Sequence, residues 1–256
     1  MTTSTTYTAR LIGLLEEMVS SQDEVLDRVA ERLAETIEQR GLIHLFGSGH
    51  SVIPTLDAYP RYGSFVGLHP LTDPRLMWHN VLGPGGVREL LWLEREEHYV
   101  EHFLEHEPIN AGDVLVVYSH SGRNAAGIEA AQYAAKRGVF TVAVTSIANR
   151  ARAAVHSSGS HLSDVCDAVI DTGVPIEDAV YVIEGSDRPF GGTSTVVATA
   201  VSHELITRTA AIVIGRGGSL ATFVSPTVAG ASLSSNDEVF AAHRALLHEA
   251  EGRAIG

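Results

Sequence analysis

The segment 113–124, read as DVLVVYSHSGRN, places strand-forming residues directly before a serine- and glycine-rich turn, and an alanine-rich helical pattern follows. In such a strand–turn–helix unit, free backbone N–H groups and the positive end of the helix dipole point into one small volume. The turn adds hydroxyl, guanidinium and amide donors to that volume. The residues concerned are Ser119, Ser121, Gly122, Arg123 and Asn124. The segment therefore predicts a phosphate-binding turn for a phosphorylated small molecule.

Short apolar runs alternate with helical patterns through the middle of the chain. The runs are 42–46, 65–68, 114–117, 139–144 and 168–170, and the helical patterns are 52–59, 87–105, 125–137 and 148–157. Strands that alternate with helices indicate βαβ units with right-handed crossovers and a parallel sheet covered on both faces. The sequence therefore predicts a three-layer α/β fold with about five parallel strands.

Both ends of the chain are predicted to be helical. Residues 8–40 have helical periodicity with an acidic outer face, and the polar stretch 20–23 is a candidate boundary between two helices. A long apolar helix is expected over 193–214, a Gly- and Ser-rich stretch over 216–235, and a terminal helix over 236–251. We expect one domain over 1–256, made of an amphipathic segment (8–40), the sheet with its helices (41–215) and a C-terminal extension (216–256).

The charge balance and the cysteine content exclude several classes of protein. With 18 basic and 31 acidic side chains the net charge is −13, so no basic footprint exists for a nucleic acid. No run reaches roughly 18 apolar residues, and the N-terminus lacks a signal-peptide pattern, so no membrane partner is expected. Cys166 is the single cysteine, which suits a reducing compartment. We expect a cytoplasmic protein.

Further polar turns are expected at the same edge of the sheet, because parallel strands bring their carboxyl ends together. The turn 47–51 follows the first strand, residues 145–146 end the fourth, and 191–195 open the long late helix. For each turn, an ordinary glycine turn or helix cap is the alternative. The candidate ligands from these turns and from the phosphate turn's own histidine are Ser48, His50, Ser51, His120, Ser146, Thr193 and Ser194.

Proton transfer on a sugar phosphate requires a base beside a carbonyl carbon. His203 and Glu204 lie within the apolar late helix, where two adjacent polar residues are unusual and indicate a specific role. Glu184 and Asp57 are further candidates near strand ends. For each of them the alternative is a hydrogen-bonded structural role. We expect no metal or other cofactor.

The histidines His98, His102 and His106 follow one another at intervals of four residues in an acidic, amphipathic segment. The first pair has the spacing that two histidines use to bind zinc on a helix. The segment is strongly acidic and no cysteine supports the site, so a solvated helix face is the favoured interpretation.

Together these motifs resemble the sugar isomerase (SIS) domain family, in its bacterial phosphosugar-binding branch near the sedoheptulose-7-phosphate isomerases. The resemblance rests on FGSGHS after the first strand, YSHSGRN after a central one and VFTVAVTS after the next helix. It also rests on Glu177-Asp178-Ala179 and on GGTST at the start of the late helix. The match covers roughly residues 8–245, nearly the whole chain.

This resemblance implies a flavodoxin-like five-stranded sheet and a homodimer or homotetramer with active sites at subunit interfaces. It assigns the phosphate to Ser119, Ser121 and the turn 122–124, with Ser48 and Ser51 as second contributors. The heptose isomerases use a histidine in the late helix, which His203 matches, and an early glutamate. At the early position this chain has Asp57, and no glutamate occurs between Ser51 and Glu89.

Three functions remain open at this point. The first is an aldose–ketose isomerase that acts through an enediol, with His203 and a carboxylate from Glu204 or Glu184. The second is a non-catalytic sugar-phosphate sensor that works with a protein partner. The third is a lyase similar to the muramic-acid-6-phosphate etherases, which also open a late helix with Gly-Ser-Thr.

Overall fold

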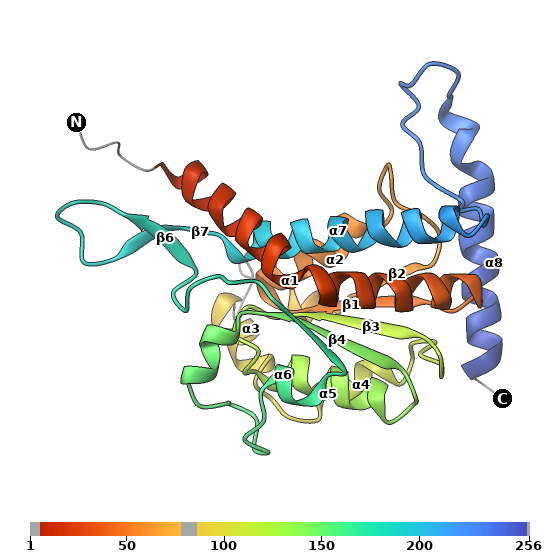
Figure 1. Cartoon of the computed structure of the whole chain (residues 1–256). Helices are drawn as coiled ribbons and strands as arrows, with labels where there is room; N and C mark the ends of the chain where they lie inside the picture. Colours follow the sequence, from red (N-terminus) through yellow and green to blue (C-terminus); the bar gives the residue numbers. More distant parts are fainter. Residues whose placement is uncertain (1–5, 78–85, 255–256) are drawn as a thin grey trace.

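A five-stranded parallel sheet forms the centre of the molecule (Figure 1). The computed structural model describes residues 6–77 and 86–254. Its strands are β1 (Ile43–Gly47), β2 (Leu68–Leu71), β3 (Val114–Tyr118), β4 (Phe140–Thr145) and β5 (Ala168–Asp171). They lie in the order β2-β1-β3-β4-β5. The expected α/β fold is confirmed, and the chain reverses direction across the sheet between β1 and β3, where ligands bind in folds of this kind.

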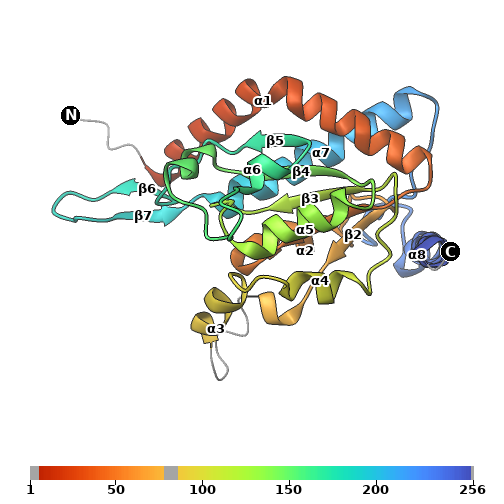
Figure 2. The same cartoon turned by 90° about the horizontal axis from the view of Figure 1, so that it is seen from below.

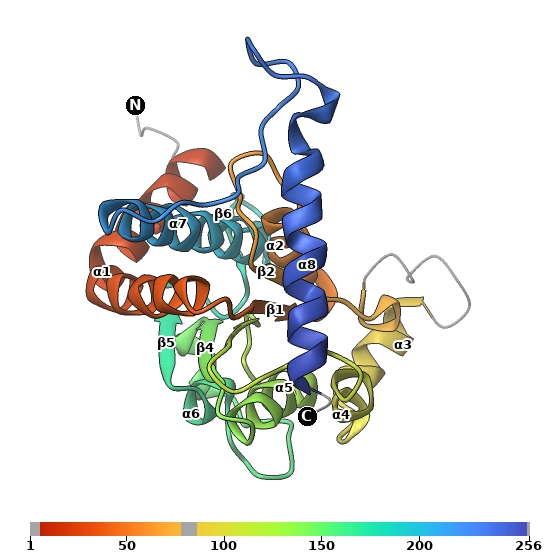
Figure 3. The ribbon, with the colours of Figure 1, turned by 90° about the vertical axis from the view of Figure 1, so that its right-hand side faces the viewer.

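Helices cover both faces of the sheet, which gives three layers (Figures 1 and 2). The helices are α1 (Tyr7–Glu38), α2 (Val52–Ala58), α3 (Gly86–Leu93), α4 (Tyr99–Leu104), α5 (Ala125–Ala135), α6 (Leu162–Val165), α7 (Ser194–Gly215) and α8 (Asp237–Ala254). Helices α1, α2 and α7 lie on one face, and α4, α5 and α6 lie on the other. Helix α8 runs past the amino-terminal edge, where Leu246 and Ala250 pack on Leu42 (Figure 3).

The first helix is continuous, so the predicted division at residues 20–23 is wrong. The hydroxyls of Ser20 and Ser21 donate to the carbonyls of Glu17 and Met18, three residues earlier. This local bonding satisfies both serines without breaking the helix. The apolar stripe of α1 packs against α7 in the core beside the sheet.

Helix α7 is long and apolar enough, by length and composition alone, to cross a membrane. In the structure it forms part of the core instead. Its residues Val197, Val201 and Leu205 are buried in the cluster that joins α1 and α7 to the strands. The apolar composition of α7 is therefore accounted for by packing on the sheet.

Several predicted boundaries need correction. The second strand lies at Leu68–Leu71 rather than 65–68, because the backbone turns at Gly67, whose φ is 121°. Phe65 forms only an isolated bridge with Thr222. The helix predicted over 148–157 is a short 3-10 turn, Ile147–Ala151, followed by a loop whose Val155 N–H donates to the carbonyl of Arg123.

The helix predicted over 87–105 is interrupted between α3 and α4. His98 adopts a left-handed conformation with φ of 69°, and its N–H donates to both carboxylate oxygens of Glu129 at 2.8 and 2.9 Å. A left-handed residue ends regular helix geometry, so the three histidines do not share one continuous helix.

The segment after β5 contains a hairpin that the sequence analysis did not predict. Strands β6 (Ala179–Val182) and β7 (Pro189–Gly192) pair antiparallel and project from the body beside the N-terminal turn of α1 (Figures 1 and 2). The Gly- and Ser-rich stretch after α7 is mostly irregular and leads through a 3-10 turn, Leu233–Asn236, into α8.

Candidate functional site

The carboxyl ends of β1, β3, β4 and β5 enclose a small polar pocket together with the first turn of α7. Five of its eight lining residues carry a hydroxyl group and one carries an imidazole. The lining residues are Ser51, Ser119, His120, Val144, Thr172, Ser194, Thr195 and Ala198. Four of the predicted ligands thus come together here: Ser51, Ser119, His120 and Ser194. Thr195, from the predicted turn 191–195, joins them, and so does Thr172, which the sequence analysis missed because only the fold brings the residue after β5 to this edge.

Two buried polar atoms of the pocket lack a hydrogen-bond partner within the described residues. They are Nδ1 of His120 and Oγ1 of Thr172. The other ring nitrogen of His120, Nε2, lies 3.3 Å from the carbonyl oxygen of Ile176. Because a carbonyl only accepts, Nε2 carries the proton, and Nδ1 is left for another group. Buried polar atoms normally have partners, so both atoms indicate a place for bound ligand or water.

The turn after β3 has the backbone geometry that the sequence predicts. Gly122 has φ of 59°, and a Cβ at this position would lie 2.8 Å from Thr145 Oγ1, so glycine is required. The Gly122 N–H donates to Ser119 Oγ at 3.1 Å. The Ser119 hydroxyl therefore accepts from the turn and keeps its own proton for a ligand.

A buried carboxylate that the sequence analysis missed binds two of the predicted phosphate ligands. Glu94, just after α3, accepts from Ser48 Oγ at 2.9 Å and from Asn124 Nδ2 at 2.8 Å. Burial raises the pKa of the Glu94 carboxyl. Ser48 and Asn124 thus hold a protein carboxylate and are not part of the pocket lining. The only signal in the sequence is a glutamate at the end of an apolar helical run.

His203 is paired with Asp57, across the contact between α7 and α2. His203 Nε2 lies 2.9 Å from Asp57 Oδ2, and Asp57 also pairs with Arg61. Helix geometry of 1.5 Å per residue puts His203 about 7.5 Å along α7 from the pocket residue Ala198. The same rise places Asp57 about 9 Å from Ser51 along the chain. A paired histidine and carboxylate are groups that can transfer protons.

The two carboxylates predicted to assist His203 lie elsewhere. Glu204 accepts from Arg208 Nε at 2.8 Å, and Arg208 also pairs with Asp23 and Asp27 on α1. Glu184 is exposed in the loop between β6 and β7. Adjacent positions on a helix point in different directions, so Glu204 faces α1 while His203 faces α2.

The remaining candidates make contacts that fix the backbone. Ser146 Oγ donates to the carbonyl of Val174, and Arg123 Nε donates to the carbonyl of Ala153 at 2.6 Å. Thr193 Oγ1 donates to the carbonyl of Asp178 at 3.0 Å. The described structure shows no side-chain hydrogen bond that fixes Ser121. His50 is exposed.

The start of α7 is already capped by a carboxylate. Asp178, in a left-handed conformation, accepts from the N–H groups of Thr193 at 2.8 Å and Ser194 at 2.6 Å. A negative group at a helix N-terminus is stabilised by the helix dipole. The α7 contribution to the pocket is consequently made by side-chain hydroxyls.

His98, His102 and His106 are all directed to solvent. Their side chains are 79%, 81% and 80% exposed. The interruption before α4 separates His98 from the other two. The favoured prediction of a solvated face therefore agrees with the geometry.

Comparison with known proteins agrees with this architecture. A family model of the SIS domain matches residues 6–146. A UPF0309 protein of Listeria innocua is 36% identical over 195 residues, which cover 76% of this chain and 77% of the relative. A phosphoheptose isomerase from Francisella tularensis has a TM-score of 0.53 at 14% identity, covering 79% of this chain and 94% of that one. The corresponding enzyme from Neisseria gonorrhoeae has a TM-score of 0.50 at 19% identity, covering 78% and 93%.

Proposed function

Because the chain belongs to the SIS-domain family, and to its UPF0309 group, we propose that it binds a phosphorylated sugar. The observation that carries the proposal is the pair of buried atoms without partners, His120 Nδ1 and Thr172 Oγ1, in a pocket rich in hydroxyls. A phosphate has enough acceptor oxygens to bond several hydroxyls at once. With a net charge of −13, local donors rather than overall electrostatic attraction must hold it.

The phosphate ligands in this proposal are hydroxyls from four separate elements and the backbone of the turn 121–124, while His120 Nδ1, which accepts hydrogen bonds, binds a hydroxyl of the sugar. The hydroxyl residues are Ser51, Ser119, Thr172, Ser194 and Thr195. Ser48 and Asn124 act indirectly, since they hold the Glu94 carboxylate at the same edge of the sheet. Arg123 fixes the loop that follows β4.

For the reaction, we propose aldose–ketose isomerisation with His203 and Asp57 as the proton-transfer pair. The base removes a proton from the carbon next to the carbonyl, and the electron pair forms an enediolate. The proton then returns to the former carbonyl carbon, and the hydroxyl proton moves to the former carbonyl oxygen, so no other reactant is needed. Asp57 replaces the Glu204 and Glu184 of the sequence prediction because it is the carboxylate that contacts His203.

Elimination is the second candidate, with Glu94 as its acid. The carboxyl group of Glu94 is held at the same edge of the sheet by Ser48 and Asn124, and burial, which raises its pKa, would help it to donate a proton to a leaving oxygen. Release of an acid product from an ether-substituted sugar phosphate would distinguish elimination from isomerisation.

We also propose that the chain assembles into a homodimer or homotetramer. Apolar side chains are exposed on the hairpin, including Val182 and Phe190, and a shallow groove lies between the hairpin and the first turns of α1. A second copy would cover this surface. Light scattering that gives a monomer at micromolar concentration would contradict the assembly.

Thr172→Val tests the binding proposal most selectively. Valine keeps the shape of threonine but lacks the hydroxyl, which has no partner within the described protein, so folding stability should not fall. We expect sugar phosphates to bind about 10-fold more weakly, as for the loss of one hydrogen bond to a charged group. Calorimetric titration measures the affinity, and Thr222→Val, at an exposed threonine, is the matched control.

Catalysis is tested with His203→Ala and Asp57→Asn in NMR assays of sugar phosphates that wild type converts. Both variants should bind substrate and lose at least 100-fold in turnover. Full turnover in His203→Ala would remove the isomerase assignment, whereas binding without turnover in wild type would make the chain a sugar-phosphate sensor.

A further inference from the structure

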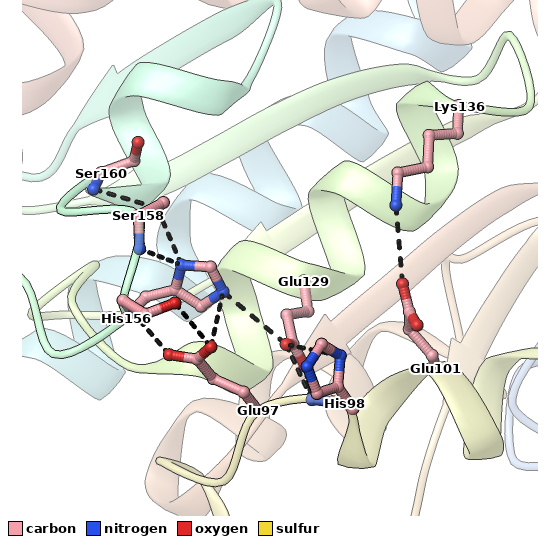
Figure 4. A network of polar contacts seen from close by, with 9 residues as sticks. Glu97, His98, Glu101, Glu129, Lys136, His156, Ser158 and Ser160 are labelled. Carbon is pink, nitrogen blue, oxygen red and sulfur yellow. Dashed lines mark hydrogen bonds and ion pairs between the residues drawn. The ribbon is translucent and has the colours of Figure 1, made fainter.

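A second polar cluster lies beside α5, on the face of the sheet that α4, α5 and α6 cover (Figure 4). Glu97 comes from the connection between α3 and α4, Glu129 from α5, and His156 from the loop after the 3-10 turn Ile147–Ala151. Each side chain offers one metal-ligating atom, and the three atoms lie within 4.8 Å of one another. Three elements that are distant in sequence therefore converge on one point.

The spacing in the cluster suits ligands of a common cation. His156 Nε2 lies 3.6 Å from Glu129 Oε1 and 4.0 Å from Glu97 Oε2. Both distances are too long for hydrogen bonds. Two ligand atoms that each lie about 2.1 Å from a zinc ion are separated by about 3.4 to 4.2 Å, depending on the angle between them.

Burial leaves the charge of Glu129 uncompensated. Its side chain is only 5% exposed, and that of His156 is 10% exposed. Within the described residues no lysine or arginine forms an ion pair with Glu129, whose carboxylate accepts from the His98 N–H. A buried carboxylate without a cation is costly, so the cluster requires a bound metal ion or a protonated histidine.

The surrounding serines orient the ligands. Ser157 donates from its N–H and its hydroxyl to Glu97 and lowers the pKa of that carboxyl, which keeps it ionised. His156 Nδ1 lies 2.8 Å from Ser158 Oγ, and the Ser160 N–H donates to the same oxygen. A proton on Nδ1 that is donated to Ser158 leaves the Nε2 lone pair directed at the carboxylates, as in metal-bound histidines.

The N–H of Ser158, 3.2 Å from His156 Nδ1, favours the opposite tautomer in a metal-free chain. A cation at Nε2 would select the tautomer with the proton on Nδ1. Metal binding should therefore move the ring proton from Nε2 to Nδ1 and change the local hydrogen bonding at Ser158.

We propose that Glu97, Glu129 and His156 form a binding site for a first-row divalent metal ion of the zinc class. Imidazole nitrogen and carboxylate oxygen are both ligand types that zinc binds, and water or the nearby His98 would complete the coordination. The ion would join the loop of His156 to α5. The same loop contacts Arg123 of the phosphate turn, so an ion that fixes the loop would also restrict the movement of that turn.

The test is calorimetric titration of Zn²⁺ into a chelator-treated chain that carries no affinity tag, at neutral pH. We expect one saturable site per chain, and at least 10-fold weaker binding in Glu129→Gln and His156→Asn. The matched control, His102→Asn with His106→Asn, changes two exposed histidines of the neighbouring segment and should bind as wild type does.

Absence of saturable binding to wild type, or equal affinity in Glu129→Gln and His156→Asn, would overturn the site. Because Glu129 is buried, circular dichroism first establishes that each variant is folded. Glu97→Gln, at a more exposed position, provides the same test with less risk to folding. A Co²⁺ absorption band in wild type that one equivalent of Zn²⁺ removes is the independent readout, and its absence would also overturn the site.

Discussion

The two edges of the parallel sheet treat buried polar groups in opposite ways. At the carboxyl edge, His120 Nδ1 and Thr172 Oγ1 are buried without partners in the described structure. At the amino edge, His44 Nε2 lies 3.1 Å from Asp113 Oδ2, and its Nδ1 lies 3.0 Å from His69 Nδ1. The first arrangement needs a ligand to complete it, while the second is complete within the chain.

The proton positions at the amino edge follow from Asp113. An ionised carboxylate only accepts, so His44 donates from Nε2 and accepts at Nδ1 from His69. Asp113 also accepts from the backbone N–H groups of Leu42 and Asn110, at 2.9 Å each. A buried polar atom without a partner that also lines a pocket, as in His120 and Thr172, is therefore a better candidate for ligand binding than the fully bonded His44.

The largest effect should come from removing the acceptor of the amino edge. Asp113→Ala leaves three buried donors without a partner, and we expect a loss of about 3–5 kcal/mol in the free energy of unfolding. Urea denaturation measures it, and Asp113→Asn, which keeps one oxygen, should lose less. A loss below about 1 kcal/mol would show that the network is not structural.

The amino edge should also make the protein sensitive to acid. Burial, first, and then the neighbouring His44 lower the pKa of His69 to about 3, against 6.5 for the ordinary side chain. Below pH 6.5 the His69 imidazole therefore binds a proton in the unfolded chain but not in the folded chain. Its contribution to the free energy of unfolding is fully present above pH 6.5 and is lost as the pH falls toward 3. The slope from one proton is at most about 1.4 kcal/mol per pH unit.

His69→Asn should flatten this acid-dependent loss of stability, as followed by urea denaturation at several pH values. The raised pKa of Glu107, caused by burial, acts in the opposite sense, because it favours the folded state at lower pH. An unchanged slope in His69→Asn would assign the acid sensitivity to other groups.

A smaller effect is expected at the carboxyl edge from Gly122→Ala. The positive φ and the close approach to Thr145 should together cost about 1–3 kcal/mol, and the displaced turn should weaken phosphate binding. Gly159→Ala is the matched control, since Gly159 also has a positive φ, of 72°, but has open space at the Cβ position. Equal losses in both variants, with binding unchanged, would mean that the close contact in the turn has no role.

The sequence was sufficient to place β1 and β3 because both are mostly apolar and buried along their whole length. Strand β2 was misplaced because it contains His69 and Pro70 and follows the turn at Gly67. The hairpin β6–β7 was missed because its four-residue strands are partly exposed and include Pro189 and two glycines. The helix predicted over 148–157 failed because its second half is held as a loop by Arg123 and Glu97, which are distant in sequence.

For the site, local patterns identified the hydroxyls that begin helices, such as Ser51 and Ser194, because a strand–turn–helix unit contains its own signal. Asp57 and His203 were each named as candidates, but their pairing depends on how α2 packs on α7. The binding of Ser48 and Asn124 by Glu94 is likewise a tertiary contact, and nothing in the local sequence indicates it.

A crystal structure with a bound hexose or heptose phosphate tests the central claim most directly. We expect phosphate oxygens within about 3 Å of the hydroxyls of Ser119, Thr172 and Ser194, with His120 Nδ1 accepting from a sugar hydroxyl and the sugar extending toward His203. A phosphate bound between Ser48 and Asn124 in place of the Glu94 carboxylate, or outside the carboxyl edge altogether, would contradict it.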